Sequence, residues 1–561
     1  MSRLARVTHG IAPSALILAY LDWLIHIAVS PDKQSQLVEK ALKKAMKLAH
    51  FSECATTHPG EAPCITPLPQ DHRFDDPSWQ QFPYNLIYQS FLLNQQWWHV
   101  ATTNVRGVSQ QHENIVSFMT RQVLDAFSPS NLPWLNPQVS DATIKQGGLN
   151  LWSGLQNLVE DVHRQVAGKP PKGAEDFQPG RDVAVTPGKV IFRNPLIEVI
   201  QYAPQTKTVY AEPILIVPAW IMKYYILDLS PENSLVSYLV SKGHTVYIIS
   251  WHNPTAIDRN VSLEDYRHDG VMAAIDAVTA VQPNTKIHSV GYCLGGTLLS
   301  IAAAAMARKG DDRLASVTLL AAETDFTEAG ELTLFINESQ VAFLESMMAE
   351  TGYLDTRQMA GAFQMLRSND LLWSKILHEY LLGRRPPMND LMAWNADLTR
   401  MPQRMHSEYL RKLFLDNDLA EGRYQVDHRP IALRDISVPI FAVATETDHV
   451  APWKSVYKIN LLSDTDVTFL LTSGGHNAGI ISEPGHPRRH YRLLEARANS
   501  KYVDPESWVE RTAPQDGSWW PLWEKWLAAK SKAGAEPPAM GAPGKGYGIL
   551  TEAPGTYIHE N

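Results

Sequence analysis

The chain has 561 residues, of which 44% are hydrophobic and 19% charged, and its formal net charge is −9. These values exclude an intrinsically disordered chain and predict a soluble globular protein of two to four domains. The mild negative charge, without a long basic block, argues against a nucleic-acid-binding surface. The three cysteines, Cys54, Cys64 and Cys293, are too few for a disulfide scaffold and form no Cys-x-x-Cys pair, so we expect a reducing, cytoplasmic location.

The first apolar run, residues 15–21, follows Arg3 and Arg6 as the apolar core of a signal peptide would. Asp22 and His26 interrupt the apolar stretch, and no small-x-small cleavage motif comes after it. The run is also too short and too polar to span a bilayer. We therefore expect an amphipathic helix, either packed against the protein or lying on a hydrophobic surface, and no transmembrane segment.

Apolar residues recur at helical spacing over residues 34–50 and continue in that style over 86–127. They predict that roughly the first 165 residues are mostly helical. The Pro/Gly stretch at 168–173 is typical of a linker or a surface loop. We therefore expect a mainly helical N-terminal domain over residues 1–185.

Short β-branched runs then alternate with helical stretches, a pattern that predicts parallel βαβ units in a doubly wound sheet. The expected strands lie at residues 190–192, 197–200, 214–217, 245–249, 287–290, 317–320, 440–443 and 467–471. The first two are close enough to form an antiparallel hairpin at the sheet edge. The alternation stops after residue 326, and the helical, aromatic stretch to about 435 predicts a cap over the carboxyl end of the sheet. We assign 186–515 to this α/β domain and expect 516–561 to be a peripheral tail.

The motif Gly291-Tyr292-Cys293-Leu294-Gly295-Gly296 stands between an expected strand and a small, apolar helix. Strand, tight glycine turn and helix are the context of the nucleophile elbow in α/β-hydrolase folds. The positive end of the following helix would favour the reactive thiolate of Cys293. The alternative is a buried structural cysteine beside a glycine turn.

An acid and a base follow in the order that this fold requires. Asp448 comes after the strand at 440–443, and His476 comes after the strand at 467–471. Each signal alone is weak, but Cys293, Asp448 and His476 together, each behind a strand, predict a nucleophile–acid–base triad. Asp325, which also follows a strand, is the reserve candidate for the acid, or otherwise a turn or cap-anchoring residue.

The oxyanion needs two fixed N–H donors. The backbone amide of Leu294, directly after the nucleophile, is the first candidate, and the amide of Ile221, in the loop after the strand at 214–217, is the second. His449 adjoins the expected acid, where it either steers a substrate hydroxyl or holds the loop. No His/Cys cluster and no glycine-rich dinucleotide loop is present, so we expect no metal and no organic cofactor.

Taken together, the motifs resemble those of polyhydroxyalkanoate synthases of the class I/II type over about residues 70–530. The segments that carry the resemblance are the elbow, 218–229, 231–234, 243–246, 250–254, 366–373 and Trp394-Asn395. The stretch 552–557 also resembles tails of such synthases. The chain departs from the family pattern at Ala219, Trp220 and Met222, which bears on substrate fit more than on reaction type.

The resemblance implies polymerisation of (R)-3-hydroxyacyl-CoA into a polyester with release of CoA. It also implies a cytoplasmic enzyme associated with polyester granules and their surface proteins, and a homodimer. Attack of a thiolate on a thioester makes another thioester, so the loading step is nearly thermoneutral and keeps the acyl chain activated. Only one cysteine lies in the expected catalytic domain, so transfer between two thiols of one subunit is disfavoured; sites shared across a dimer and a CoA-bound intermediate stay open.

Two other functions remain at this point. An intracellular polyester depolymerase or thioesterase would use the same triad but release free acid. A non-catalytic granule-surface or scaffold protein would use the helical N-terminal region, although an intact triad argues against it.

Overall fold

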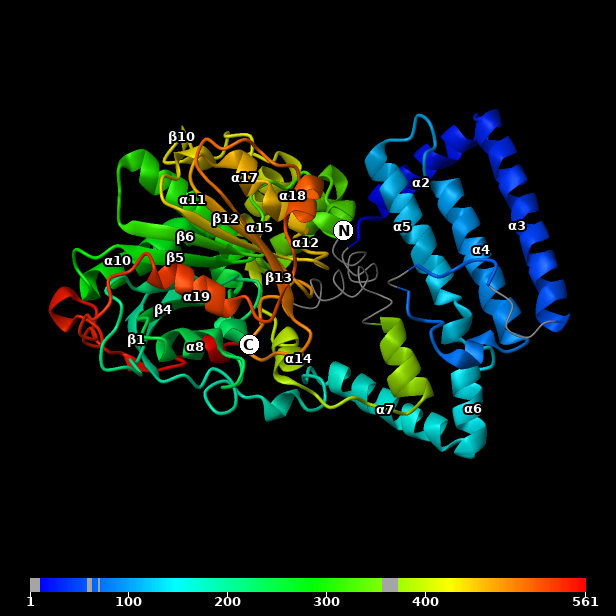
Figure 1. Ribbon diagram of the computed structural model, residues 1–561, viewed down its shortest axis with the longest axis horizontal. Coiled ribbons are helices and arrows are strands. Elements are labelled where there is room, and N and C mark those ends of the chain that lie inside the picture. Colours follow the sequence, from blue (N-terminus) through cyan, green and yellow to red (C-terminus); the bar gives the residue numbers. More distant parts are fainter. Residues whose placement is uncertain (1–10, 58–62, 69–70, 356–371) are drawn as a thin grey trace. The chain divides into compact units, whose positions relative to one another are not determined.

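The computed structural model describes residues 11–57, 63–68, 71–355 and 372–561. The described chain falls into two compact units. Residues 11–172 and 372–387 form the helical unit, and residues 173–355 and 388–561 form the sheet unit (Figure 1). Each unit has its own hydrophobic core and is described separately.

The helical unit is built from amphipathic helices, as the spacing of apolar residues predicts. Ala19 and Trp23 of α2 pack against Ile115 and Val116 of α5 in one core cluster. The opposite face of α2 is also apolar but exposed, with Leu18 at 53% and Ile25 at 59% exposure. The helices of the unit are α2 (Pro13–Ala28), α3 (Pro31–Thr57), α4 (Tyr84–Thr102), α5 (Gln110–Ala126), α6 (Pro137–Lys145), α7 (Leu149–Val166) and the π-helix η9 (Ile376–Leu381).

The sheet unit is organised around one large mixed sheet of order β14-β13-β12-β11-β6-β5-β3-β4-β2-β1-β15. Its central strands from β12 to β4 are parallel, and antiparallel strands flank them on both sides. The predicted hairpin is confirmed, because β1 and β2 pair antiparallel. The strands are β1 (Gly188–Arg193), β2 (Ile197–Tyr202), β3 (Ile214–Val217), β4 (Val246–Trp251), β5 (Ile287–Tyr292), β6 (Leu314–Leu320), β11 (Ile440–Thr445), β12 (Val467–Thr472), β13 (His490–Ala496), β14 (Gln515–Asp516) and β15 (Thr551–Glu552).

Helices cover this sheet because its central strands are apolar on both faces: every residue of β3, β4, β5, β11 and β12 is buried. The helix α11 packs on β5 and β6, while Trp523 of α19 donates a hydrogen bond to Thr318 of β6. The helices of the core are α8 (Leu235–Ser241), α9 (Leu263–Asp265), the π-helix η6 (Tyr266–Met272), α10 (Ala273–Val281), α11 (Leu294–Lys309), α16 (Trp453–Tyr457), α17 (Ile459–Leu462), α18 (Pro505–Arg511) and α19 (Trp520–Ala528).

The insertion between β6 and β11 is helical, as expected, but only part of it belongs to the sheet unit. That part contains α12 (Glu338–Thr351), α14 (Asp390–Asn395), α15 (Gln403–Tyr409) and the π-helix η10 (Leu410–Leu415), with the short strand pairs β7 (Tyr353–Leu354) with β8 (Met401–Pro402) and β9 (Gln425–Val426) with β10 (Arg429–Pro430). Residues 372–387 instead pack on α7 of the helical unit. Arg385 binds Glu160 and Asp161 there, and Asn150 donates to the carbonyl of Leu381.

The stretch after residue 515, which we expected to be peripheral, is built into the sheet unit. Trp519, Trp520 and Trp523 are at most 1% exposed, and β15 pairs with β1. Burial of three indoles in the core explains why this tryptophan-rich stretch cannot be a loose tail.

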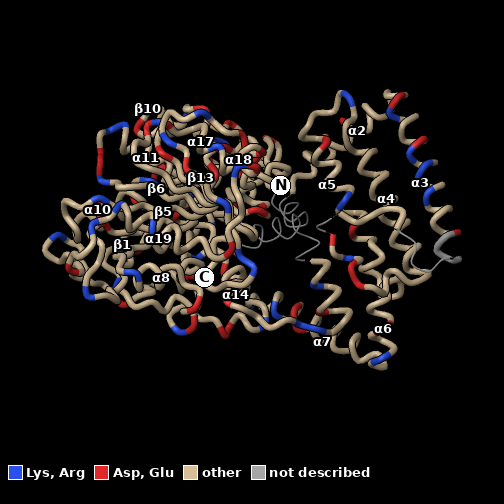
Figure 2. The backbone as a smooth tube through the Cα atoms, in the orientation of Figure 1, with Lys and Arg blue, Asp and Glu red and all other residues tan. Residues whose placement is uncertain are grey.

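Within each unit, acidic and basic residues are interspersed along the backbone (Figure 2). Among the described residues, none of the helices is by itself long and apolar enough to cross a membrane. The only described candidate is a pair, Pro13–Ala28 with Pro31–Glu53, which has the length and composition but is bent by 89°.

Candidate active site

Cys293 occupies a sharp turn between β5 and α11. Its backbone has φ 52° and ψ −126°, a conformation that costs free energy for any residue with a Cβ. The residue is 7% exposed, and its own N–H donates to the carbonyl of Leu320 at 2.9 Å. The turn thus holds a thiol in a strained, enclosed position at the carboxyl end of a central strand, as the elbow motif predicts.

The flanking glycines are required by close backbone contacts. A Cβ on Gly291 would lie 2.3 Å from the Cα of Gly296, and one on Gly295 would lie 2.1 Å from the carbonyl oxygen of Val217. These separations are far inside van der Waals contact, so no other residue fits without a backbone shift.

The carboxylate of Asp448 is buried, and both of its oxygens accept hydrogen bonds. Its Oδ1 accepts from the amides of Val450 and Ala451, both at 2.9 Å. Its Oδ2 accepts from the hydroxyl of Thr445 at 3.0 Å and lies 2.8 Å from Nδ1 of His476. Burial alone would raise the pKa of Asp448, but the imidazole and these hydrogen bonds hold it below its usual value, so the carboxylate is ionised.

His476 links this carboxylate to the thiol. Its side chain is 12% exposed. Burial would lower the pKa of His476, but the charges of Asp448 and Cys293 and hydrogen bonds to both side chains raise it well above its usual value. The structure therefore brings Cys293, His476 and Asp448 into one connected group, although they are far apart in sequence.

The two amides expected to bind an oxyanion lie on elements that meet at the elbow. Leu294 is the first residue of α11, so its N–H has no acceptor within the helix. The loop after β3 packs directly on the elbow, since Val217 and Pro218 are the neighbours that a Cβ on Gly295 would strike. Ile221, further along this loop, is fixed through its carbonyl, which accepts from the amide of Thr399 at 3.4 Å.

Asp325 and His449 lie outside the connected group. Asp325 accepts from the amide of Thr327 at 2.8 Å and lies 3.5 Å from Nζ of Lys458, contacts typical of a turn and an anchoring ion pair. His449 is exposed, and its backbone carbonyl packs against Gly330.

Comparisons with known proteins place the chain in a family. Models of the poly-beta-hydroxybutyrate polymerase (PhaC) N-terminus match residues 70–239 and 2–33, and the alpha/beta hydrolase fold model matches residues 212–481. A poly(3-hydroxyalkanoate) polymerase of Methylorubrum extorquens is 40% identical over 533 residues, which are 93% of this chain and 87% of the relative. The chain belongs to the poly(3-hydroxyalkanoate) polymerase family. The predicted family resemblance and the α/β-hydrolase fold are thereby confirmed.

Other members of the polymerase family align over a similar extent. The PhaC subunit of the polymerase of Cupriavidus necator is 34% identical over 545 residues, 96% of this chain and 90% of that relative. Among solved structures, an alpha/beta hydrolase fold protein from Chitinophaga pinensis aligns with 53% of this chain and 93% of its own at 13% identity, with a TM-score of 0.30.

Glu323, a carboxyl group that the sequence did not single out, also belongs to the site of this polymerase-family chain. It is 7% exposed, and its Oε1 is buried without a hydrogen-bond partner. Burial raises the pKa of Glu323 well above its usual value, the charges of Asp448 and Cys293 raise it further, and only Ser455 and His476 oppose the shift. Burial thus favours the neutral form of Glu323, whereas the hydrogen bonds of Asp448 favour its carboxylate. Its position three residues after β6, at the same sheet edge as Asp325, was the one available signal.

The cap holds the histidine loop through a hydrogen-bond chain that the sequence also did not reveal. Tyr292, next to the nucleophile, donates to Oδ1 of Asn477 at 2.6 Å, and Nδ2 of Asn477 donates to Asn395 of the cap at 3.2 Å. Aromatic residues from the cap and the β3 loop pack nearby: the rings of Trp220 and Tyr409 are 6.4 Å apart, and those of Phe326 and Phe414 are 4.8 Å apart. Tyr409 of this aromatic cluster lies close enough to Cys293 for the charge of the thiolate to raise the pKa of the Tyr409 hydroxyl, which burial already raises.

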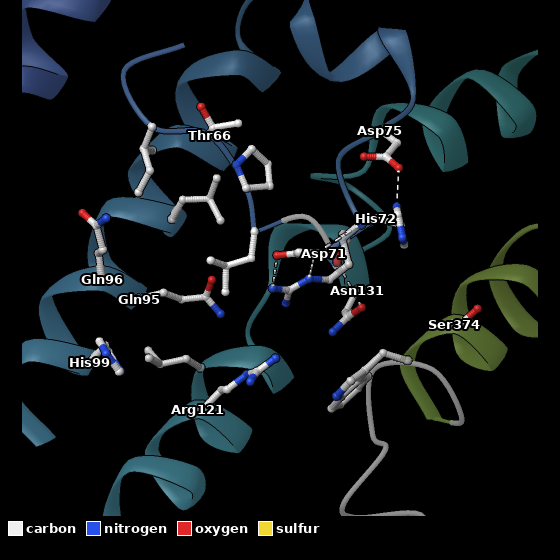
Figure 3. A pocket seen from close by; sticks show the side chains of 18 of the residues that line it. Thr66, Asp71, His72, Asp75, Gln95, Gln96, His99, Arg121, Asn131 and Ser374 are labelled. Atoms are coloured by element: carbon white, nitrogen blue, oxygen red, sulfur yellow. Dashed lines mark hydrogen bonds and ion pairs between the residues drawn. The ribbon is translucent and has the colours of Figure 1, made fainter. Parts of the chain in front are cut away.

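A cavity of about 940 Å³ lies in the helical unit (Figure 3). Two ion pairs lie in its lining: Arg73 binds Asp71, and His72 lies 2.7 Å from Asp75. None of the described residues that line it is a cysteine. Among the residues that the structure describes, no group of three or more His, Cys, Asp or Glu side chains is placed to hold a metal ion.

Proposed function

We propose that the protein polymerises (R)-3-hydroxyacyl-CoA into a polyester, with release of CoA, by covalent catalysis on Cys293. The observation that carries the proposal is the strained Cys293 beside an imidazole that is itself paired with Asp448 at 2.8 Å. Membership of the poly(3-hydroxyalkanoate) polymerase family supports the choice of reaction.

In the loading step, the Cys293 thiolate attacks the thioester carbonyl, and the carbon–sulfur bond to CoA breaks. The imidazolium of His476 gives its proton to the departing CoA thiolate, so CoA leaves as the thiol. The raised pKa of His476 supports this role, because it keeps the ring protonated while the thiolate is present. The product is an acyl chain held on Cys293 as a thioester.

In the transfer step, the 3-hydroxyl of another hydroxyacyl group attacks the Cys293 thioester. His476 accepts the hydroxyl proton, an ester bond forms, and the Cys293 thiolate leaves. Asp448 orients the imidazole and stabilises its charge in both steps. The amides of Leu294 and Ile221 would bind the oxyanion that forms at each attack.

A single thiol per catalytic domain limits how the chain can be handed on. The described Cys64 lies in the helical unit, where it donates to Gln89, and takes no part in the elbow. Transfer would then pass through CoA-bound hydroxyacyl groups or through the Cys293 of a second copy in a homodimer. Size measurement by light scattering, with and without substrate, distinguishes these routes.

Exposed apolar helix faces support association with polyester granules. On α7, Trp152, Leu155 and Val159 follow one another at helical spacing and are 49–59% exposed. The exposed face of α2 is similar. Replacing Trp152 and Leu155 by Glu should shift the protein from the granule pellet to the supernatant; unchanged co-sedimentation would contradict this role.

The experiment that separates synthesis from hydrolysis follows two products at once. Purified protein is incubated with (R)-3-hydroxybutyryl-CoA while free CoA thiol and polymer are both measured. Polymer in proportion to CoA release supports the proposal, whereas CoA release with free hydroxy acid and no polymer would identify a thioesterase or depolymerase instead.

A further inference from the structure

Residues 556–561, here called the clasp, lie far from the elbow in sequence and are hydrogen-bonded to the sheet unit. The buried carboxylate of Glu198 in β2 accepts from the amides of Thr556 and Tyr557 at 2.9 and 3.1 Å, and from the hydroxyl of Thr556 at 2.8 Å. The hydroxyl of Tyr557 donates to the carbonyl of Asn194 at 2.6 Å. These hydrogen bonds hold the clasp in one defined conformation.

Glu560 is the polar centre of the clasp. Its Oε2 lies 2.7 Å from Nδ1 of His252 and accepts from the amide of Asn253 at 2.7 Å. The side chain of Asn253 donates back to the carbonyl of Glu560 at 3.3 Å. These contacts tie the clasp to the chain directly after β4.

The clasp also binds the loop that carries Ile221. Lys223, two residues further on, is 4% exposed, and its Nζ donates to the carbonyls of Glu560 and Tyr557 at 2.6 and 3.2 Å. Burial lowers the pKa of Lys223, and the negative charges of Asp397 and Glu560 oppose that shift. A buried ammonium of this kind is held only where its partners stay in place.

The cap also contacts the loop at 220–223, through hydrogen bonds to two of its backbone carbonyls. The hydroxyl of Thr399 donates to the carbonyl of Trp220 at 2.6 Å, and the indole of Trp394 donates to the carbonyl of Lys223 at 2.7 Å. Arg400 then joins the cap to the clasp, since its guanidinium donates to an oxygen of Asn561 at 2.9 Å. The conformation of residues 220–223 thus depends on contacts with both the cap and the clasp.

We propose that Glu560 is a positioning residue, which fixes the loop at 220–223 and with it the Ile221 amide in the orientation that stabilises the oxyanion. The inference rests on the proposed acyl transfer at Cys293. The carboxylate of Glu560 anchors the clasp on His252 and Asn253, and the anchored clasp places the backbone carbonyls of Tyr557 and Glu560 that accept from Lys223. A lost oxyanion donor typically costs about 10²–10³ in rate, and small misplacements cost part of that.

Two reactions of the Cys293 thiol distinguish a misplaced oxyanion donor from general damage to the active site. Alkylation of Cys293 by iodoacetamide needs the thiolate but forms no oxyanion, whereas CoA release from (R)-3-hydroxybutyryl-CoA needs both. Full-length Glu560→Ala and Glu560→Gln are compared with Glu552→Gln, a matched control on the same stretch of chain whose carboxylate is 73% exposed and pairs with Lys189.

The expected result for Glu560→Ala is a fall in kcat of about 10- to 100-fold, with KM and the alkylation rate within about threefold of the unaltered protein and a smaller loss for Glu560→Gln. Glu552→Gln should behave like the unaltered protein. An unchanged kcat, or an alkylation rate that falls in parallel with kcat, would overturn the proposal. If Glu560→Ala does not fold, Lys223→Met, which removes the buried charge but keeps the apolar stem, gives the same comparison.

A failure of the proposed function would give a different result from a failure of the Glu560 proposal. If alkylation of the unaltered protein leaves CoA release intact, Cys293 is not the acyl acceptor, whatever the Glu560 variants do.

Discussion

Oδ2 of Asp448 lies 2.8 Å from Nδ1 of His476, whereas Asp325, at the end of a neighbouring strand, pairs with Lys458. The charge of Asp448 raises the pKa of His476, and the charge of Cys293 raises it further. Of the two residues that the sequence offered as the acid, Asp448 therefore contacts the base, His476, and Asp325 does not.

We predict that Asp448→Asn lowers kcat for CoA release by about 10³–10⁴, because the imidazole loses its orientation and its compensating charge. Removing that charge also lowers the pKa of His476. Because the release of CoA requires the imidazolium, the alkaline limb of the pH–rate profile should therefore move to lower pH. Asp325→Asn is the control and should keep the position of that limb; a shift with Asp325→Asn but not with Asp448→Asn would reverse the assignment.

Cys293→Ser should change the products as well as the rate. A serine ester is less activated than a thioester, so transfer to a 3-hydroxyl slows more than hydrolysis does. We expect polymer formation to fall by at least about 10³ while residual CoA release yields free hydroxy acid. Quantifying polymer and free acid together checks this, and polymer formation at the unaltered rate by Cys293→Ser would count against thioester catalysis.

Gly295→Ala should damage both stability and activity. The added Cβ would lie 2.1 Å from the carbonyl oxygen of Val217, so the elbow or the β3 loop must shift, at a cost of about 1–3 kcal/mol or more. Gly544 is a matched control, because a Cβ there meets nothing within 4 Å. Thermal unfolding should show a lower midpoint for Gly295→Ala alone; equal midpoints for the two variants would show that the elbow is looser than described.

Buried neutral histidines predict that the fold weakens in mild acid. Burial lowers the pKa of His406 to about 4, and the same holds for His244 and His288. Between the usual value of 6.5 and about 4, the unfolded chain takes up protons that the folded chain does not, so the free energy of unfolding falls as pH falls. Each such group contributes a loss of about 2 kcal/mol between pH 7.5 and 5.

The variant that tests this is His406→Leu, which removes one of these groups. Its unfolding midpoint should depend less on pH between 7.5 and 5 than that of the unaltered protein. His268→Leu, whose side chain is 71% exposed before substitution, should leave the pH dependence unchanged. Equal pH dependence in both variants would mean that His406 is protonated in the fold.

Much of the central sheet could be predicted because its parallel strands are buried on both faces and therefore read as continuous apolar runs. The flanking strands could not. β13 contains Arg492 and Glu495 and is only partly buried, and β15 is two residues long. The tryptophans near 520 gave no indication of whether they pack inward or form a peripheral tail, and contacts with the sheet decide the question.

The residues of the candidate site also fall into those that the sequence indicated and those that it did not. Cys293, Asp448 and His476 carry local signals, because each follows a strand in a fixed order. Glu560 carries no such signal, and Glu323 has only its position after β6. Their importance comes from burial beside the site and from contacts with residues more than 100 positions away, as in the bond between Lys223 and the backbone carbonyl of Glu560. Such contacts have no periodicity that a single sequence reveals.

The most direct test of covalent catalysis on Cys293 is to trap the acyl-enzyme. The protein is mixed with (R)-3-hydroxybutyryl-CoA, quenched in acid within one turnover, and analysed by intact mass and peptide mapping. We predict a mass increase of whole 3-hydroxybutyryl units on the peptide that contains Cys293, released by hydroxylamine and absent in Cys293→Ala. Acyl groups on another residue, or polymer formation by Cys293→Ala at the unaltered rate, would contradict it.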